Sequence, residues 1–228
     1  MRVAAVVVAI AAIPALWAVV HWWPGRGALT YFGLSMRPQQ FTGSRDSRYP
    51  LAAPHDGIPG VANFAEVSGQ LWRGAQPTRE GFARLKAMGV RTIVNLRETH
   101  DDQAMLEGLG LRYEHIPFNP AAPSDEVIAA FMKTVSAPEN QPVFVHCLAG
   151  SDRTGTVVAV YRHMVQGWPM EEAVKELERF GFHEVWTELL QYLATLDAEK
   201  VWGLAGRGGE KPRERRDSSS AASAASSE

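Results

Sequence analysis

The chain has 228 residues, of which 46% are hydrophobic and 21% are charged, and its formal net charge is -2. This composition is typical of one globular domain with additional segments. The balanced charge argues against a nucleic-acid partner. Cys147 is the single cysteine, which excludes an intramolecular disulfide and a cysteine-rich zinc site.

Residues 3–23 form an apolar run interrupted only by Pro14 and His21, with three tryptophans toward its end. As a helix this run would extend for roughly 30 Å, about the hydrocarbon thickness of a bilayer. We therefore expect residues 1–23 to be an uncleaved, single-pass transmembrane anchor; a cleaved signal peptide and a buried helix are the alternatives. Arg2 slightly favours a catalytic domain outside the cytoplasm, whereas arginines on the other flank favour the opposite orientation.

Two further segments have the composition of connecting or disordered chain. Residues 24–65 are rich in glycine, proline and polar residues, and we expect a linker that lies over the domain or is irregular. Residues 203–228 are dominated by Gly, Arg, Ser and Ala. Such a segment cannot bury enough apolar area to offset its ordering entropy, so a disordered tail is predicted there.

Between these segments, short apolar runs alternate with stretches of helical periodicity. Strands are predicted over residues 71–73, 90–96, 111–116 and 142–145, and helices over residues 78–89, 101–109, 124–135, 154–165, 169–180 and 183–196. This alternation favours an α/β domain whose central, mainly parallel sheet is flanked by helices.

The segment His146-Cys147-Leu148-Ala149-Gly150-Ser151-Asp152-Arg153-Thr154-Gly155 joins a buried strand to an apolar helix. Backbone N–H groups of a tight loop at a helix N-terminus bind phosphate, and an arginine adds a planar fork of donors. The same positive environment populates the thiolate of Cys147. Cys147 or Arg153 alone would more often be structural. Together they indicate a nucleophile that attacks phosphorus and a clamp for the transition state.

The other residues of this loop receive supporting roles. Thr154 can donate its hydroxyl to the sulfur of Cys147, and His146 is expected to order the loop by hydrogen bonding. The remaining loop residues would bind the phosphate group of the substrate: Leu148, Ala149, Gly150 and Ser151.

The loop is similar to the His-Cys-x5-Arg-Ser/Thr signature of the protein tyrosine and dual-specificity phosphatase superfamily. Residues 71–78 and 89–97 also resemble the opening strands of its compact bacterial and atypical dual-specificity members. The resemblance covers about residues 66–197 and implies the cysteine-phosphatase fold, a phosphatase domain over residues 66–202, no metal and no cofactor. It also places Arg73 and Arg97 near the site entrance, with structural salt bridges as the alternative.

The sequence departs from this family at the general acid, which is normally an aspartate on a loop upstream of the cysteine. Asn119 occupies that position, and an amide cannot act as an acid. Asp125, at a helix start, and Asp152, inside the phosphate loop, are the candidate substitutes. Myotubularin-like lipid phosphatases also have an aspartate before the loop arginine. The structural alternatives are a first-turn charge for Asp125 and pairing with loop amides or a basic side chain for Asp152.

The predicted function is hydrolysis of phosphoric monoesters through a phosphocysteine intermediate, on phosphotyrosine or dual-specificity substrates. A lipid or phosphoinositide phosphatase and a phospho-ligand binding module without turnover are alternatives. A rhodanese-type sulfurtransferase is a weaker one. The expected partners are a phosphorylated protein, a small phosphate monoester or a lipid phosphate, together with the membrane through residues 3–23.

Overall fold

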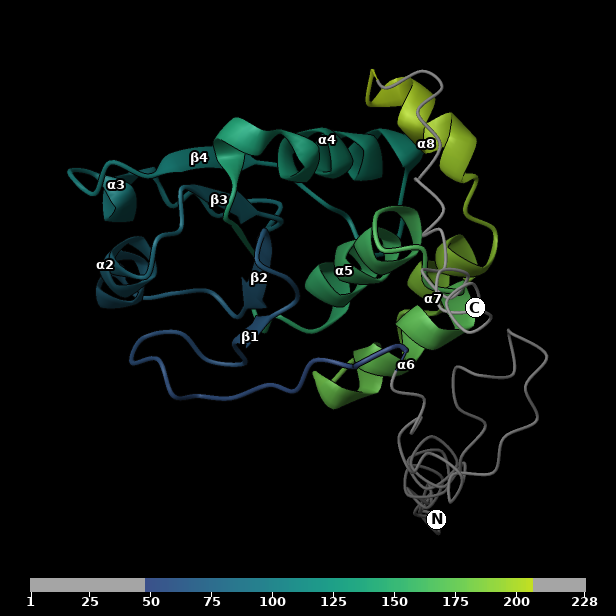
Figure 1. Ribbon diagram of the computed structural model, residues 1–228, viewed down its shortest axis with the longest axis horizontal. Helices are drawn as coiled ribbons and strands as arrows, with labels where there is room; N and C mark the ends of the chain where they lie inside the picture. The colour runs from purple at the N-terminus through teal and green to yellow at the C-terminus, as the bar shows by residue number, and fades with distance from the viewer. Residues whose placement is uncertain (1–47, 207–228) are drawn as a thin grey trace, which may run out of the picture. The chain divides into compact units, whose positions relative to one another are not determined.

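The computed structural model describes residues 48–206 (Figure 1). Residues 3–23, for which a membrane anchor is predicted, lie outside this range, as do the first part of the predicted linker and the tail after residue 206. Among residues 48–206, no helix combines the length and apolar character needed to cross a bilayer.

A five-stranded sheet forms the centre of the domain; the sequence predicts a central, mainly parallel sheet and four of its strands, but not the strand at residues 65–66. Its strands are β1 (Ala65–Glu66), β2 (Leu71–Gly74), β3 (Thr92–Asn95), β4 (Arg112–His115) and β5 (Val143–His146). Their spatial order is β1-β2-β5-β3-β4, in which β1 is antiparallel to β2 and all other pairs are parallel. The strand that leads to the phosphate loop, β5, is therefore central and covered on both faces.

Helices surround the sheet. They are α2 (Arg79–Ala87), α3 (Gln103–Leu106), α4 (Asp125–Ser136), α5 (Asp152–Met164), α6 (Met170–Arg179), α7 (Thr187–Ala194) and α8 (Ala198–Leu204), with a short 3₁₀ helix η3 (Pro138–Asn140). The pair α2 and α3 lies on one side of the sheet, and α5 with α6 lies on the other (Figure 1). Thr78 and Ser124 cap α2 and α4 as predicted, by accepting from backbone N–H groups of the first turn.

Alternation along the strands sends successive side chains to opposite faces of the sheet. Trp72, Ile93 and Phe144 pack toward α2 in one apolar cluster. The neighbouring positions, including Arg73 and Val145, face the other side. Different residues therefore pack around the end of β5 on the two faces of the sheet.

The folded domain begins before residue 66, which corrects the predicted start. Ile58, Val61 and Phe64 are buried in the cluster on the α2 side, and the backbone of His55 forms an antiparallel bridge with Phe64. Burial of these side chains holds the segment against the sheet, although its glycines and prolines give it no periodicity.

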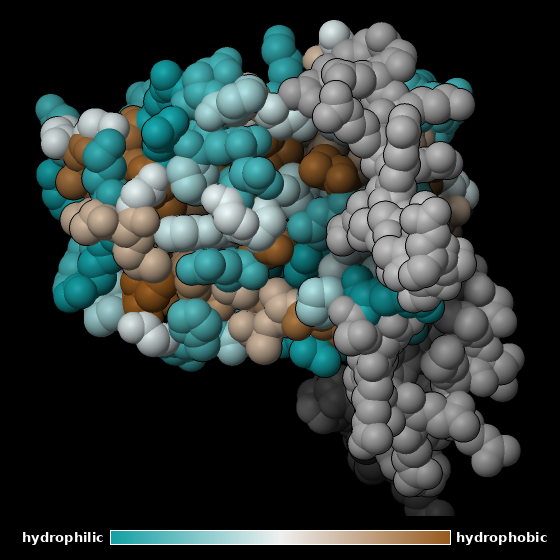
Figure 2. Space-filling model, viewed as in Figure 1, coloured by the Kyte–Doolittle hydropathy of each residue, from teal (hydrophilic) through white to brown (hydrophobic). Residues whose placement is uncertain are grey.

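The C-terminal part of the domain also differs from the prediction. The helix predicted over residues 183–196 is shorter, since residues before Thr187 form turns. A further helix, α8, starts after its cap Asp197, whose side chain accepts from the N–H of Lys200, and packs against α4. Ala205 is buried, so ordered structure extends past the predicted end at residue 202. In the view of Figure 2 the surface is mainly hydrophilic, with hydrophobic residues in small groups.

Candidate active site

The segment of residues 147–151 connects the end of β5 to the first residue of α5. The side chain of Cys147 is buried, whereas Leu148 is largely exposed. Gly150 has a φ of +72°, and a Cβ atom there would lie 2.4 Å from the carbonyl carbon and oxygen of Gly74. Only glycine fits this contact, which explains the residue at the centre of the loop.

Groups outside the loop bind three successive loop carbonyls. The backbone N–H of Gln76 donates to Leu148 O at 3.0 Å, and Asn63 Nδ2 donates to Ala149 O at 3.0 Å. Arg73 Nη2 donates to Gly150 O at 2.8 Å. In contrast, the N–H groups of residues 148–153 form no hydrogen bond within the described part of the chain. Such free amides at the N-terminus of a 13-residue helix are available to a bound anion.

Arg153 and Thr154 stand at the start of α5 as the sequence predicts. The guanidinium Nη1 of Arg153 donates to Leu96 O at 3.4 Å, a long contact that a phosphate could replace. Thr154 Oγ1 is buried and has no hydrogen-bond partner in the described chain. The predicted bond from Thr154 to the sulfur of Cys147 is therefore not formed in this structure, but its hydroxyl is free to make it.

Arg73 is not at the site entrance, which corrects that expectation. Its side chain is fully buried, and its Nη1 lies 3.7 Å from Glu176 Oε1 of α6. Its Cζ lies 3.6 Å from the ring centroid of Phe180. Burial lowers the pKa of Arg73 to about 10, against the opposing effects of Glu176 and Cys147, so Arg73 remains a cation at neutral pH. It braces the loop from the α6 side of the sheet.

On the other face of the sheet, His146 is held by Asp102. His146 Nε2 lies 3.0 Å from Asp102 Oδ2, and both side chains are fully buried. The other ring nitrogen, Nδ1, contacts the carbonyl oxygen of Cys147 at 3.1 Å. The two ring nitrogens of His146 therefore lie against a carboxylate oxygen and a carbonyl oxygen. The predicted ordering role of His146 thus has a structural basis that also requires Asp102.

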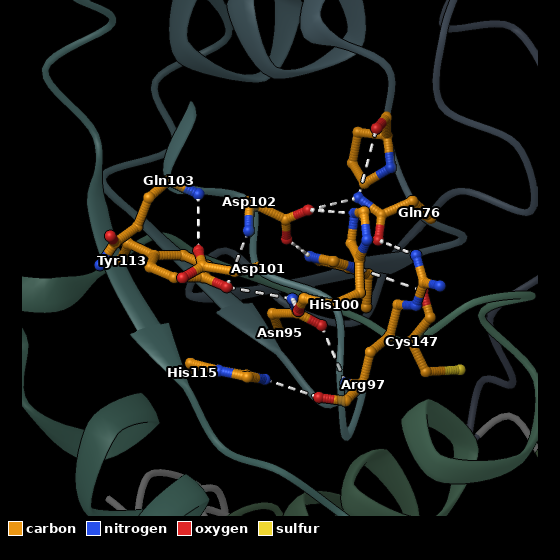
Figure 3. Close-up of polar contacts among 12 residues, drawn as sticks. Gln76, Asn95, Arg97, His100, Asp101, Asp102, Gln103, Tyr113, His115 and Cys147 are labelled. Atoms are coloured by element: carbon orange, nitrogen blue, oxygen red, sulfur yellow. Dashed lines mark hydrogen bonds and ion pairs between the residues drawn. The ribbon is translucent and has the colours of Figure 1, made fainter. Parts of the chain in front are cut away.

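Asp102 is itself surrounded by polar groups, as Figure 3 shows. Gln76 Nε2 donates to its Oδ1 at 2.7 Å, and His100 Nε2 lies 3.3 Å from the same oxygen. Burial works to raise the pKa of Asp102, but the interactions with His146, Gln76 and His100 outweigh it and hold the pKa below the usual 3.8. Asp102 is therefore ionised at neutral pH.

Gln76 also connects Arg97 to this network. Arg97 Nη1 donates to Gln76 Oε1 at 3.1 Å, while the backbone N–H of Gln76 binds the loop at Leu148. The backbone of Arg97 is fixed by Asn95 Oδ1, which accepts from its N–H at 2.8 Å. Arg97 is therefore near the loop, as expected, and half-buried (Figure 3).

Both candidate acids are engaged elsewhere. The two oxygens of Asp152 contact His183 Nδ1 at 3.1 and 3.0 Å, and the backbone N–H of His183 donates to Oδ1 at 2.8 Å. Asp125 accepts from Tyr192 Oη at 2.8 Å and lies 2.7 Å from Lys200 Nζ. The hydrogen bond from Lys200 is the main reason why the pKa of Asp125 is lowered. These contacts favour the structural alternatives: a pair with a basic side chain for Asp152 and a helix-start charge for Asp125.

Asn119 is exposed, and its Oδ1 accepts from the N–H of Ala121 at 2.9 Å. This short turn shapes the segment in which the family has its acid, and no carboxylate stands between residues 116 and 124. The site as described thus combines unpaired loop amides with the buried thiol of Cys147, without a free carboxylic acid on the segment around Asn119.

Replacing Asp125 or Asp152 by asparagine tests these assignments. We expect each variant to retain most of its kcat on a substrate with a poor leaving group, because the loss of a general acid costs about 10²–10⁴-fold. Asp125→Asn should instead lower the free energy of unfolding. The folded-state pKa of Asp125 is lowered from 3.8. The difference in unfolding free energy between wild type and Asp125→Asn should therefore shrink as the pH falls below about 4. A hundredfold loss of kcat in one variant alone would identify that residue as the acid.

The sequence did not reveal Asp102, Glu176 or His183. Glu176 had a detectable signal, since it lies on the same helical face as the apolar Ala173 and Leu177. A carboxylate on such a face needs a buried cation. Asp102 and His183 stand at the beginnings of the helices predicted over residues 101–109 and 183–196, and nothing in their local sequence indicates their partners.

Comparisons with known proteins identify the family of the chain. The family model described as "DSP-PTPase phosphatase fused to NAD+ Kinase" matches residues 60–190. The dual specificity protein phosphatase TpbA of Pseudomonas aeruginosa strain UCBPP-PA14 is 33% identical over 121 residues, which cover 53% of this chain and 55% of TpbA. The inositol diphosphatase SIW14 of Saccharomyces cerevisiae is 24% identical over 156 residues, 64% of this chain and 54% of SIW14.

The solved structures show the same fold. A Cys-to-Ser variant of P. aeruginosa TpbA, in complex with phosphotyrosine, superposes with a TM-score of 0.61 at 27% identity, over 72% of this chain and 100% of that one. The chain spans little more than half the length of TpbA and SIW14 as whole proteins. The family model nevertheless covers more than half of this chain, and the chain therefore belongs to the DSP-PTPase family of dual-specificity and tyrosine phosphatases.

Proposed function

We propose that the protein is a cysteine-dependent phosphatase that hydrolyses phosphoric monoesters. The observation that carries this proposal is the loop of residues 147–153. Within the described part of the chain the N–H groups of residues 148–153 are unpaired, the carbonyls of residues 148–150 are bound from outside, and the loop begins with the buried Cys147. These amides, with Arg153, hold the three equatorial oxygens of the transferring group.

The reaction runs in two displacements at phosphorus. The Cys147 thiolate forms an S–P bond while the bond from phosphorus to the leaving oxygen breaks, and the leaving group departs with that electron pair. Water then attacks phosphorus and breaks the S–P bond, which releases inorganic phosphate and restores the thiolate. His146 and Arg73 keep the loop in place from the two faces of the sheet.

Release of inorganic phosphate from p-nitrophenyl phosphate by the purified full chain, in buffer with EDTA, tests this proposal. We expect turnover in the presence of EDTA. In a parallel assay without EDTA, which would bind vanadate, we expect orthovanadate to inhibit, because vanadate adopts the geometry of the transition state. Saturable binding of phosphate without any turnover would instead support a phospho-ligand binding module.

For the substrate, we propose a phosphotyrosine-containing or dual-specificity phosphoprotein. The TpbA variant that superposes on this chain is in complex with phosphotyrosine. The exposed Leu148 at the loop offers an apolar contact for an aromatic leaving group. The loop also lacks lysine, which argues against a highly charged polyphosphoinositide.

A diphosphate is the second candidate substrate, because the segment around Asn119 holds no free carboxylic acid. A departing phosphate group has a pKa of about 6, compared with about 10 for the tyrosine hydroxyl, so it needs no proton from the enzyme. Two of the curated relatives are inositol diphosphatases.

The two candidates can be separated by comparing kcat/KM on a phosphotyrosine peptide, a phosphoserine peptide and an inositol diphosphate under the same conditions. A phosphotyrosine peptide that is turned over at least about tenfold faster than the diphosphate would support the first candidate. The reverse order would support the second.

We also propose that residues 3–23 anchor the domain to a membrane, with the catalytic domain outside the cytoplasm. The support is the length and apolar character of this run. Deleting residues 1–23, or introducing a charge with Val8→Arg, should move the protein from the membrane to the soluble fraction. Recovery of the intact, unmodified chain in the soluble fraction would contradict the anchor. A mature protein whose N-terminus lies after residue 23 would show that the run is a cleaved signal peptide.

A further inference from the structure

A group of buried charges lies under the catalytic loop, on the α6 side of the sheet. It consists of Arg73 from β2, Arg162 from α5 and Glu176 from α6, all of them nearly inaccessible to solvent. Arg162 Nη2 lies 2.7 Å from Glu176 Oε2, and Arg73 Nη1 lies 3.7 Å from Glu176 Oε1. Two guanidinium groups therefore share one carboxylate, and the three side chains carry one unit of positive charge in excess.

The hydrogen bonds assign this excess charge to Arg73. Arg162 is better satisfied than Arg73: its Nη1 donates to Val67 O at 3.1 Å and to Gln166 Oε1 at 2.8 Å, its Nη2 pairs closely with Glu176, and only its Nε has no partner in the described chain. Arg73, in contrast, donates only to Gly150 O, and its Nε and Nη1 form no hydrogen bond in the described chain. A buried cation that is only partly paired is costly unless a further anion lies near it.

The negative charge that would balance Arg73 can come from Cys147 in the loop. Arg73 contacts the loop at Gly150, three residues after Cys147, and the side chain of Cys147, which would carry the negative charge as a thiolate, is buried in the same loop. With this thiolate, the two arginines and Glu176 form a neutral set. Gly155 lies beside this group, since a Cβ atom there would be 3.8 Å from Arg73 Nη2 and 2.5 Å from Leu177 Cδ2.

We infer that Arg73 is a positioning residue whose buried charge stabilises the thiolate of Cys147 while its guanidinium fixes the Gly150 carbonyl. The other charged groups around the loop do not replace it. Asp102 lies against His146 on the opposite face of the sheet, and Asp152 lies against His183. Arg153 is half-buried at the start of α5, where its Nη1 donates to Leu96 O, and its proposed partner is the substrate phosphate. The inference rests on the proposed role of Cys147 as the nucleophile.

The pH dependence of alkylation of Cys147 by iodoacetamide tests the inference without requiring turnover. Because Cys147 is the single cysteine of the full-length chain, the rate reports the thiolate directly. Arg73→Met should raise the midpoint of this pH profile by about one pH unit or more. Such a shift corresponds to an about tenfold smaller thiolate fraction at pH values below the midpoint. Glu176→Gln should lower the midpoint, since it leaves both arginines without their carboxylate. Arg73→Lys keeps the charge and should stay near the wild-type midpoint.

Arg84→Met is the matched control, since Arg84 is an exposed arginine on α2 that pairs with Glu80, and it should leave the midpoint unchanged. A purely structural role for Arg73 predicts that all buried variants lose thermal stability without opposite shifts of the midpoint. If Arg73→Met does not fold, the inference is decided by Glu176→Gln and Arg73→Lys. If the midpoint of the alkylation pH profile rises or stays constant in Glu176→Gln, the inference about Arg73 is overturned. Failure of the phosphatase proposal would instead appear as absent turnover with these shifts intact.

Discussion

Cys147→Ser should reduce turnover of p-nitrophenyl phosphate by at least about a thousandfold. The serine hydroxyl is a far weaker nucleophile than a thiolate, and the loop provides no base to activate it, since both ring nitrogens of His146 are engaged by Asp102 and the carbonyl of Cys147. Stopped assays with the full chain, measured as inorganic phosphate released, give the residual rate.

Two control measurements make this result specific. Serine is close in size to cysteine, so the thermal midpoint of unfolding should change little, and phosphate or vanadate should still bind to the loop amides of residues 148–153. Retention of more than about a tenth of the wild-type rate would contradict the thiolate mechanism. Lost turnover with lost anion binding would indicate a damaged loop rather than a missing nucleophile.

Removing the carboxylate of Asp102 is expected to have the largest effect on stability. Asp102→Ala leaves the imidazole of His146 and the amide of Gln76 without their buried partner, and breaking a buried ion pair costs about 3–5 kcal/mol. The isosteric Asp102→Asn keeps an acceptor and should cost less. Urea unfolding of the full chain at pH 7 measures both differences.

The effect of Asp102 depends on pH with a defined sign. Its folded-state pKa is lowered from 3.8, so its contribution is complete above about pH 4 and is lost as the pH falls through the folded-state value. The difference in stability between wild type and Asp102→Asn should therefore narrow under acid conditions. Asp101→Asn is the control: Asp101 is exposed, its carboxylate accepts from the N–H of Gln103, and we expect a change within about 0.5 kcal/mol. A difference that grows on acidification would show that Asp102 is not ionised in the fold.

Cys147 and Asp102 have different roles in the proposed site. Cys147 acts on the substrate directly, whereas Asp102 acts through His146 on the backbone that carries Cys147. A folded variant of Asp102 should therefore lose less activity than Cys147→Ser. The loss should increase with the degree to which the loop is displaced. Thiol alkylation rates, measured on the same samples, would separate a displaced loop from a lost nucleophile.

Local sequence was enough to predict the phosphate loop and most of the fold. The run Val143–His146, Gly150 and the apolar helix after Arg153 define a strand, a tight turn and a helix through short-range preferences. Because these preferences act between close neighbours, they do not depend on the rest of the chain. The same reasoning predicted the caps Thr78 and Ser124, and the alternation of strands and helices predicted the parallel sheet.

The roles of the charged residues were decided by tertiary structure. Arg73 and Gly150 are 77 residues apart, and Asp125 and Tyr192 are 67 apart. The first contact exists because the order β1-β2-β5-β3-β4 brings β2 beside β5, and the second because Tyr192 of α7 reaches the first residue of α4. Burial makes such pairs decisive, since a charge out of water needs a partner whatever its distance along the chain. The sequence by itself therefore determined what the loop can do, while the packing of distant elements decided which arginine and which aspartates support it.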